Sequence, residues 1–268
     1  MQNKTMKVLF LGDIVGAPAR ACIKARLAAV ITEGQFDFVV ANGENAAQGS
    51  GITPSVVQEL FASGIDILTL GDHTFRKKDG LVCMSDPRIV RPLNWSRRAI
   101  GHGTAFVEKN GKKLGVMALI GRVFMDPYDS PFDAALDALP QLKQQTPCVL
   151  VDMHAEATSE KIAMTRFLAG KASAVIGTHT HVPTADERIV AGYTGAITDC
   201  GMSGSIDSVL GRDAEKILLF FSTNMPASFD VTDKDVRLQG VSLTLDETTG
   251  ACLHIKRVEY CSNSAQGG

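Results

Sequence analysis

The sequence predicts an α/β fold in which parallel strands are joined by helices. For most of its length, short apolar runs alternate with stretches whose apolar residues recur at helical spacing, which is typical of βαβ units with right-handed crossovers. After about residue 229 the pattern changes to apolar runs separated by turns, which indicates antiparallel strands. No internal repeat or linker divides the chain. We therefore expect a single domain over residues 1–268, with a core from about residue 6 to residue 260.

The first part of the chain contains three expected strands and two expected helices. The strands cover residues 7–11, 38–41 and 65–70, and the first helix covers residues 19–32, where Ile23 and Leu27 lie four positions apart. The second helix begins after Thr53, a good N-cap residue, with Pro54 in the first turn where proline fits best.

The remaining elements follow in the same way. Residues 106–109 and 114–119 flank Asn110-Gly111, the strongest short hairpin signal. Expected helices cover residues 133–142 and 158–168. Expected strands end at His154 and His179, and another covers residues 196–199. The last expected strands are antiparallel and cover residues 229–231, 236–245 and 252–258, and residues 262–268 are expected to be a loose end.

Composition narrows the class of protein. The formal net charge is −2, so no basic surface favours long nucleic acid. The six cysteines form no C-x-x-C pair, and we expect free thiols in a reducing compartment. The N-terminal residues are polar, and no apolar stretch approaches the roughly 20 residues of a membrane span. The sequence therefore predicts a cytoplasmic protein without a membrane anchor; closed homo-oligomers are a base-rate expectation for soluble enzymes.

Two histidines in Gly177-Thr178-His179-Thr180-His181 are the strongest chemical signal. They follow an apolar run, and residues two apart on a strand point to the same side. Neutral imidazole is the commonest side-chain metal ligand. His154 ends a second apolar run in the same manner. Three histidines at two strand ends predict a metal centre at one edge of a sheet.

Other strand ends carry ligand types as well, and in open α/β sheets ligands bind outside the carboxyl ends of strands. The seven candidate metal ligands are Asp13, Glu44, Asn45, Asp72, His154, His179 and His181. Each residue alone could be a turn former or a helix cap. Together they are too many for one ion and suit two metals bridged by Glu44. The mixed set of carboxylate, amide and imidazole favours iron, manganese or zinc over calcium or magnesium.

These motifs resemble, in order, those of calcineurin-like metallophosphoesterases: Gly12-Asp13, Gly43-Glu44-Asn45, Gly71-Asp72-His73, His154 and Gly177-Thr178-His179-Thr180-His181. Further segments are similar to the bacterial YmdB-like group. They are Asn42 to Ala47, His154 to Lys161, Gly177 to Val182 with Thr184-Ala185-Asp186, and Thr198 to Gly204. The resemblance runs from about residue 7 to residue 258.

The resemblance implies a four-layer α/β/β/α sandwich of two mixed sheets with two metal ions at the strand ends, often iron with manganese able to substitute. The first metal would take Asp13, His181 and Asn45. The second would take Asp72, His154 and His179, and Glu44 would bridge them. The implied activity is hydrolysis of small phosphodiesters such as 2′,3′-cyclic AMP and GMP, by hydroxide generated between the metals. His73 would be the general acid for the leaving ribose oxygen; its alternative role is a third ligand of the second metal.

Two departures from the resemblance bear on activity. Val15 stands where the broad superfamily has a histidine, a loss that the YmdB-like group shares. Asp72 stands where the family has asparagine, and its extra negative charge would lower the Lewis acidity of the second metal. Two alternatives therefore stay open. One is a broad phosphatase or nuclease on the same site, and the other is a weakly active nucleotide-binding regulatory protein.

Several residues are candidates for supporting roles. Ser203, Gly204 and Arg122 are candidate substrate contacts. Arg91 and Arg122 are candidate phosphate contacts, and a surface salt bridge is the alternative for either arginine. Asp152 and Glu156 flank His154 and could orient a ligating imidazole, or they could be solvated or capping residues.

Overall fold

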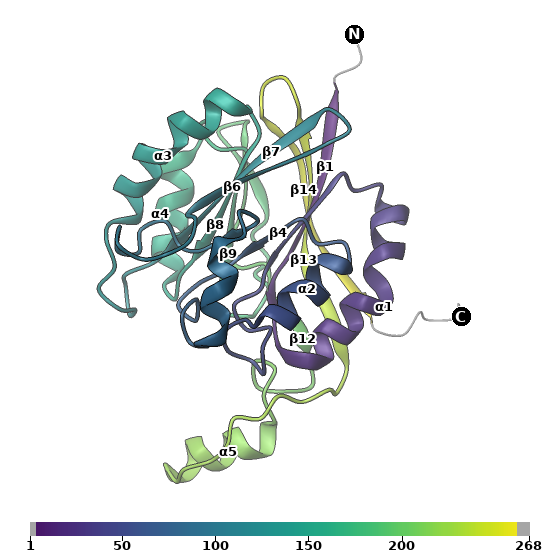
Figure 1. Ribbon diagram of the computed structural model, residues 1–268, viewed down its shortest axis with the longest axis vertical. Helices are drawn as coiled ribbons and strands as arrows, with labels where there is room; N and C mark the ends of the chain where they lie inside the picture. The colour runs from purple at the N-terminus through teal and green to yellow at the C-terminus, as the bar shows by residue number, and fades with distance from the viewer. Residues whose placement is uncertain (1–3, 262–268) are drawn as a thin grey trace.

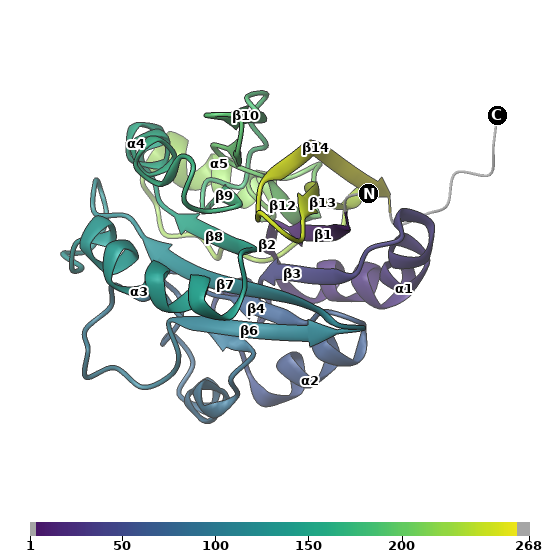
Figure 2. The same ribbon diagram turned by 90° about the horizontal axis from the view of Figure 1, so that it is seen from above.

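The computed structural model describes residues 4–261. Within this range the strands form two mixed sheets that pack face to face, with helices on both outer faces (Figures 1 and 2). The order of the layers is α/β/β/α, which confirms the four-layer sandwich expected from the resemblance.

The first sheet places three strand ends at one edge. Within residues 4–261 it has eight strands in the order β2-β12-β13-β1-β3-β4-β5, with β14 paired to β13. Strands β1, β3, β4 and β5 run parallel, whereas β13 is antiparallel to β1. The bounds are β1 (Thr5–Leu11), β2 (Asp13–Ile14), β3 (Phe38–Asn42), β4 (Ile67–Thr69), β5 (Ile89–Val90), β12 (Met202–Ser205), β13 (Val236–Asp246) and β14 (Cys252–Cys261).

The second sheet supplies the other two strand ends. In the described range it has six strands in the order β10-β11-β9-β8-β7-β6, of which β7, β8, β9 and β11 run parallel. The bounds are β6 (Thr104–Lys109), β7 (Lys112–Ile120), β8 (Val149–His154), β9 (Ala174–Thr178), β10 (Arg188–Val190) and β11 (Thr194–Ile197). The β6–β7 pair is the hairpin expected at Asn110-Gly111.

Alternating apolar residues join the layers. On β1, Leu9 and Leu11 pack under the helices, whereas Val8 and Phe10 face the second sheet, as the two-residue period of a strand requires. Helices α1 (Gly16–Gly34) and α2 (Pro54–Ala62) cover the first sheet, and α3 (Pro131–Gln145) and α4 (Thr158–Leu168) cover the second (Figure 2). A 3₁₀ helix, η1 (Asp79–Ser85), precedes β5.

Most expected elements are present, but one expected strand is absent and one helix and several short strands were not predicted. The hydroxyl of Thr53 accepts a hydrogen bond from Val56 N–H at 3.4 Å, which confirms the predicted N-cap. The strand expected at residues 229–231 is wrong, because Val231 makes only an isolated bridge to Arg212 in an irregular segment. That segment returns from α5 (Ala214–Thr223), a helix that the sequence reading missed and that projects from the body (Figure 1). The residues 262–268, expected as a loose end, lie outside the described residues.

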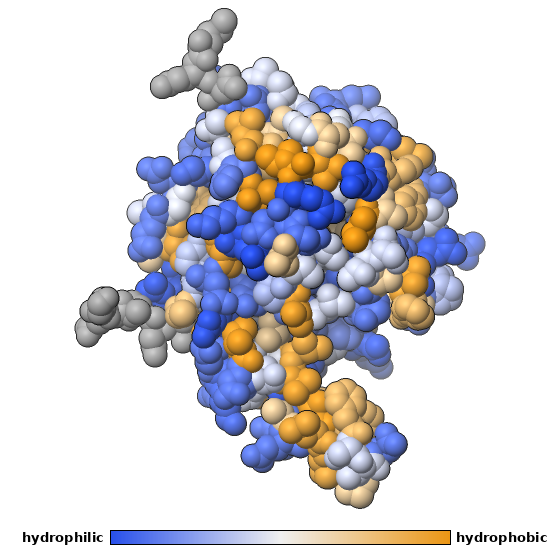
Figure 3. Space-filling view, turned by 180° about the vertical axis from the view of Figure 1, so that it is seen from behind, coloured by the Kyte–Doolittle hydropathy of each residue, from blue (hydrophilic) through white to orange (hydrophobic). Residues whose placement is uncertain are grey.

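The surface, the helices and the cysteines each add one observation. Apolar side chains gather on the projecting arm around α5, where Leu218 and Phe221 are 61% and 70% exposed (Figure 3). No helix among residues 4–261 combines the length and apolar character needed to cross a membrane. The cysteines of the described range are all free, and Cys261 alone of them is exposed, which agrees with the expected free thiols.

Candidate metal centre

The parallel strands of both sheets end at one region and bring the seven predicted ligands there. Asp13 follows β1 at the start of β2, Glu44 and Asn45 follow β3, and Asp72 and His73 follow β4. His154 is the last residue of β8, and His179 and His181 follow β9. The first sheet thus contributes the acidic and amide ligands and the second sheet contributes the imidazole ligands.

Four of these side chains form a compact cluster. One ligand atom from each of Glu44, Asp72, His154 and His179 lies within 4.8 Å of the others. His154 Nε2 lies 3.0 Å from His179 Nδ1, 3.1 Å from Asp72 Oδ1 and 3.3 Å from Glu44 Oε1. The lone pairs of two ring nitrogens this close repel each other unless one nitrogen carries a proton. Their mutual approach fits a cation held between them.

The remaining ligands lie beside this cluster. Asn45 Nδ2 lies 3.3 Å from His181 Nε2, and His181 Nε2 lies 3.8 Å from Asp13 Oδ1. Asp13 Oδ1 is buried without a hydrogen-bond partner among the described residues. An unpaired buried carboxylate oxygen is costly, so this atom also fits a cation ligand. Glu44 Oε1 accepts a hydrogen bond from Asn45 Nδ2 at 3.2 Å and therefore lies between the two groups.

Gly71 leaves room for the cluster. A Cβ added at Gly71 would lie 2.2 Å from His154 Nε2 and 2.4 Å from Glu44 Oε2. Any side chain at this position would fill the space between ligand atoms. The glycine of the Gly71-Asp72-His73 motif is thus required by the close approach of the backbone to the centre.

Burial and mutual charge set the protonation of the metal-free cluster. Burial raises the pKa of Asp13. Burial also acts to raise the pKa of Glu44, but the attraction of His154 outweighs it and lowers that pKa. For Asp72, hydrogen bonds from His154 and His179 likewise outweigh burial and hold the pKa below its usual value. Burial opposes the charged form of His154, yet Glu44 and Asp72 raise its pKa well above the usual value. Without metal, a proton on His154 therefore neutralises part of the carboxylate charge.

His73 lies at the edge of the cluster and is 26% exposed through its side chain. Its Nδ1 lies 2.8 Å from Asn45 Oδ1, and its Nε2 lies 3.4 Å from Asp72 Oδ2. Its backbone N–H donates to Glu44 Oε2 at 3.0 Å. The imidazole is thus oriented by neighbours of both ligand groups while part of it faces solvent.

A buried hydrogen-bond network orients His154. Thr178 Oγ1 lies 2.9 Å from His154 Nδ1 and donates to Asp152 Oδ1 at 2.6 Å. Asp152 Oδ2 also accepts from Thr69 at 2.5 Å and from Asn42 at 3.1 Å. Burial raises the pKa of Asp152 to about 6. Asp152 therefore acts on His154 through Thr178, and such partners fix the ring orientation of a ligating histidine.

The loop that carries the two histidines is held by an ion pair. Lys161 Nζ lies 2.9 Å from Asp199 Oδ2, and both residues are fully buried. The same oxygen accepts from Thr180 N–H at 3.0 Å and from Thr180 Oγ1 at 2.6 Å. On either side of Thr180, His179 and His181 have φ of 95° and 63°, left-handed values that are uncommon for side chains other than glycine. Sequence patterns alone do not identify this support, because an inward-facing lysine in a helix looks like a solvated one.

The other candidates occupy different environments. Glu156 lies 3.2 Å from His179 Nε2, in position to orient that ring. Arg91 is buried and donates to three backbone carbonyls, those of Pro92, Ala99 and Ile100, so the predicted phosphate contact and the surface salt bridge are both wrong.

The three predicted substrate contacts differ in exposure. Ser203 and Gly204 are buried inside β12, and a Cβ at Gly204 would meet Val15, so neither faces an open surface. Arg122 is exposed, and its backbone N–H donates to Glu160 at 2.9 Å. Of the three, only Arg122 is therefore accessible to a ligand in this conformation.

Comparisons with known proteins agree with the fold and the motifs. The sequence profile of the family described as "YmdB-like protein" matches residues 9–258. The chain is 42% identical over 254 residues to a Bacillus subtilis protein named 2′,3′-cyclic-nucleotide 2′-phosphodiesterase, covering 94% of this chain and 96% of that one.

Solved structures extend the likeness to the whole fold. A phosphatase from Mycoplasma pneumoniae superposes with a TM-score of 0.90 at 32% identity, covering 97% of this chain and 95% of that one. A Thermus thermophilus protein described as hypothetical gives 0.89 at 36% identity, covering 96% and 99%. With its motifs, its fold and these matches along nearly the whole chain, this protein belongs to the YmdB-like family.

Proposed function

We propose that this protein is a metal-dependent phosphodiesterase that hydrolyses 2′,3′-cyclic nucleotides of the AMP and GMP type. It is an enzyme of the phosphoesterase class, as the names of its relatives indicate. The observation that carries the proposal is the cluster of Glu44, Asp72, His154 and His179 at the strand ends of a chain so similar to a named cyclic-nucleotide phosphodiesterase. The free cysteines support a reducing compartment, and we propose the cytoplasm.

The donor set fits two cations. Asp13, Asn45 and His181 would hold one, and Asp72, His154 and His179 would hold the other, with Glu44 between them. The contact of Glu44 Oε1 with both Asn45 and His154 supports the shared position. Nitrogen and oxygen donors together favour iron or manganese, with zinc as a third choice. When bound, such ions supply positive charge for the phosphoryl oxygens and lower the pKa of a coordinated water.

The chain's own residues would orient the substrate and move one proton. His73 lies beside both ligand groups and is partly open to solvent, so its imidazole can reach a leaving ribose oxygen. A proton given to that oxygen neutralises the charge that develops as the bond to phosphorus breaks. Asn45 and Asp72 orient the ring from either side. Arg122, being exposed, remains a candidate contact for the substrate.

Asp72 favours a second candidate, a slow enzyme that binds nucleotides and acts as a regulator. A carboxylate there adds negative charge close to the phosphate. A broad phosphatase or nuclease on the same site is the other alternative. Hydrolysis of 2′,3′-cyclic AMP, of p-nitrophenyl phosphate and of a single-stranded oligonucleotide by protein with measured metal content separates all three. The proposal expects metal-dependent turnover of the cyclic nucleotide above the other two substrates. Binding of the cyclic nucleotide without turnover would favour the regulator.

A further inference from the structure

Three aromatic rings from different segments form a cluster that is only half-buried. Phe75 and Trp95 meet edge to face with ring centroids 5.1 Å apart, and Trp95 and Tyr128 are tilted at 4.8 Å. Aromatic groups in such contact normally lie in a core, because burying them releases apolar surface from water. Here all three keep part of their surface exposed.

The cluster lies against the candidate metal centre. Phe75 is two residues beyond His73, in a turn closed by a hydrogen bond from Thr74 Oγ1 to the Gly71 carbonyl at 2.6 Å. Burial raises the pKa of the Tyr128 phenol, and the charges of Asp126, Asp72 and Glu44 raise it further. Phe75 links the aromatic cluster to the turn that carries Asp72 and His73, and this contact places the cluster beside the centre.

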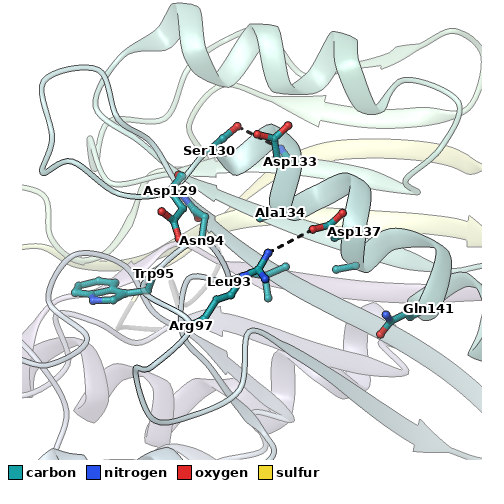
Figure 4. Close-up of a pocket in the computed structure, with 11 residues that line it drawn as sticks. Leu93, Asn94, Trp95, Arg97, Asp129, Ser130, Asp133, Ala134, Asp137 and Gln141 are labelled. Atoms are coloured by element: carbon teal, nitrogen blue, oxygen red, sulfur yellow. Dashed lines mark hydrogen bonds and ion pairs between the residues drawn. The ribbon is translucent and has the colours of Figure 1, made fainter.

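Trp95 also lines a groove between residues 93–97 and residues 129–141 (Figure 4). Its volume is about 650 Å³, within the roughly 300–1,000 Å³ of small-molecule sites. Asn94 fixes its floor, because its side-chain amide donates to the carbonyls of Ile120 and Asp129 at 2.8 Å each. Trp95 thus contacts Phe75, next to the turn that carries Asp72 and His73, and also lines a groove of suitable size for a nucleoside.

The charge of the groove distinguishes the two ends of a nucleotide. Its lining includes the carboxylates of Asp129, Asp133 and Asp137, with Arg97 as a cation that lies 4.0 Å from Asp137 at an exposed position. Carboxylates repel a phosphate and accept hydrogen bonds from the amino groups of a base. The groove therefore suits the base end, and the phosphate end belongs at the metal centre.

We propose that the base of the substrate stacks on Trp95 with its edge in this groove, while the cyclic phosphate lies at the metal centre. This inference rests on the proposed function. Every base has a face that can stack on an aromatic ring, and stacking is one of the strongest contacts available to a nucleoside. Trp95 is then a specificity-determining residue that acts on substrate affinity rather than on the chemical step.

The chain offers a direct probe, because Trp95 is its only tryptophan. Titration of metal-loaded protein with 2′,3′-cyclic AMP, followed by tryptophan emission, should give saturable quenching. The base-free methyl riboside 2′,3′-cyclic phosphate should give none. Absence of quenching at concentrations of 2′,3′-cyclic AMP that occupy the metal centre would overturn the proposal. This readout needs no turnover, so failure of the phosphodiesterase activity is recognised separately, as wild-type protein that quenches but does not hydrolyse.

Steady-state kinetics provide the second arm. Trp95→Ala should raise KM for 2′,3′-cyclic AMP about 10- to 100-fold, with little change in kcat and no change in KM for the base-free phosphate. Trp95→Phe keeps an aromatic face and should recover most of the affinity. Phe167→Ala is the matched control, because Phe167 belongs to a separate aromatic pair with Phe132, 5.2 Å apart on the outer helices. An equal rise in KM for both substrates would contradict base stacking.

Discussion

The hydroxyl of Thr180 should contribute measurably to metal affinity, although it touches no metal ligand side chain. It donates to Asp199 Oδ2 at 2.6 Å, and that oxygen is also held by Lys161 at 2.9 Å. A hydrogen bond to a charged group is worth about 1.5–3 kcal/mol, and the partial exposure of Thr180 favours the lower end. The left-handed conformations of His179 and His181 cost of order 1–3 kcal/mol each, so the loop needs such bonds to hold both imidazoles in place.

Thr180→Val removes the hydroxyl and keeps the branched shape. If the lost hydrogen bond reduces the free energy of metal binding by about 1.4 kcal/mol, because the loop is less ordered, the affinity for Mn²⁺ falls about tenfold. Calorimetric titration of metal-free protein measures this, with urea unfolding of the same metal-free sample as a stability reference. Thr180→Ser, which keeps the donor, is the matched control and should bind metal like the wild type. An unchanged metal Kd in Thr180→Val, or an equal loss in Thr180→Ser, would refute the reasoning.

Three further predictions concern the centre itself. His73→Ala should keep its metals, counted by elemental analysis, and lose about 10²–10⁴-fold in kcat; loss of metal would show a ligand instead. Asp72→Asn removes one negative charge next to the phosphate and should raise kcat for 2′,3′-cyclic AMP, while a fall would contradict the electrostatic argument. Because Glu44 and Asp72 raise the pKa of His154, metal uptake at pH 7 should release about one proton per chain and weaken as pH falls. Calorimetry in two buffers of different ionisation enthalpy tests this, and a release near zero would exclude a protonated His154.

The sequence predicted the parts of the fold that depend on local pattern. Helix α4 has the expected bounds of residues 158–168. The strands that precede Asp13 and Glu44, and the strand that ends at His154, lie where their apolar runs place them. The carboxyl ends of parallel strands lie at the same edge of a sheet. Ligand residues that follow each apolar run in the sequence were therefore enough to predict that their side chains lie close together. The single-domain organisation stays a prediction.

The features that the sequence missed depend on tertiary contacts. Helix α5 has little buried surface, since Ile217 alone among its residues is buried, and short strands such as β5 and β12 exist only through pairing with distant segments. Lys161 and Asp199 are 38 positions apart, and the sequence around either residue does not predict a buried ion pair. Arg91 was a candidate phosphate contact with a surface salt bridge as the alternative, yet its guanidinium is buried and donates to three backbone carbonyls.

The most direct test of the central claim is hydrolysis of 2′,3′-cyclic AMP by protein whose bound metals have been counted, compared with metal-free and reconstituted samples. The account predicts two metals per chain, turnover that disappears with the metals, and turnover that returns when iron or manganese is restored. Two bound metals without turnover would contradict the phosphodiesterase and leave a binding role. Failure to bind metal under any condition would contradict the assignment of Glu44, Asp72, His154 and His179 as ligands.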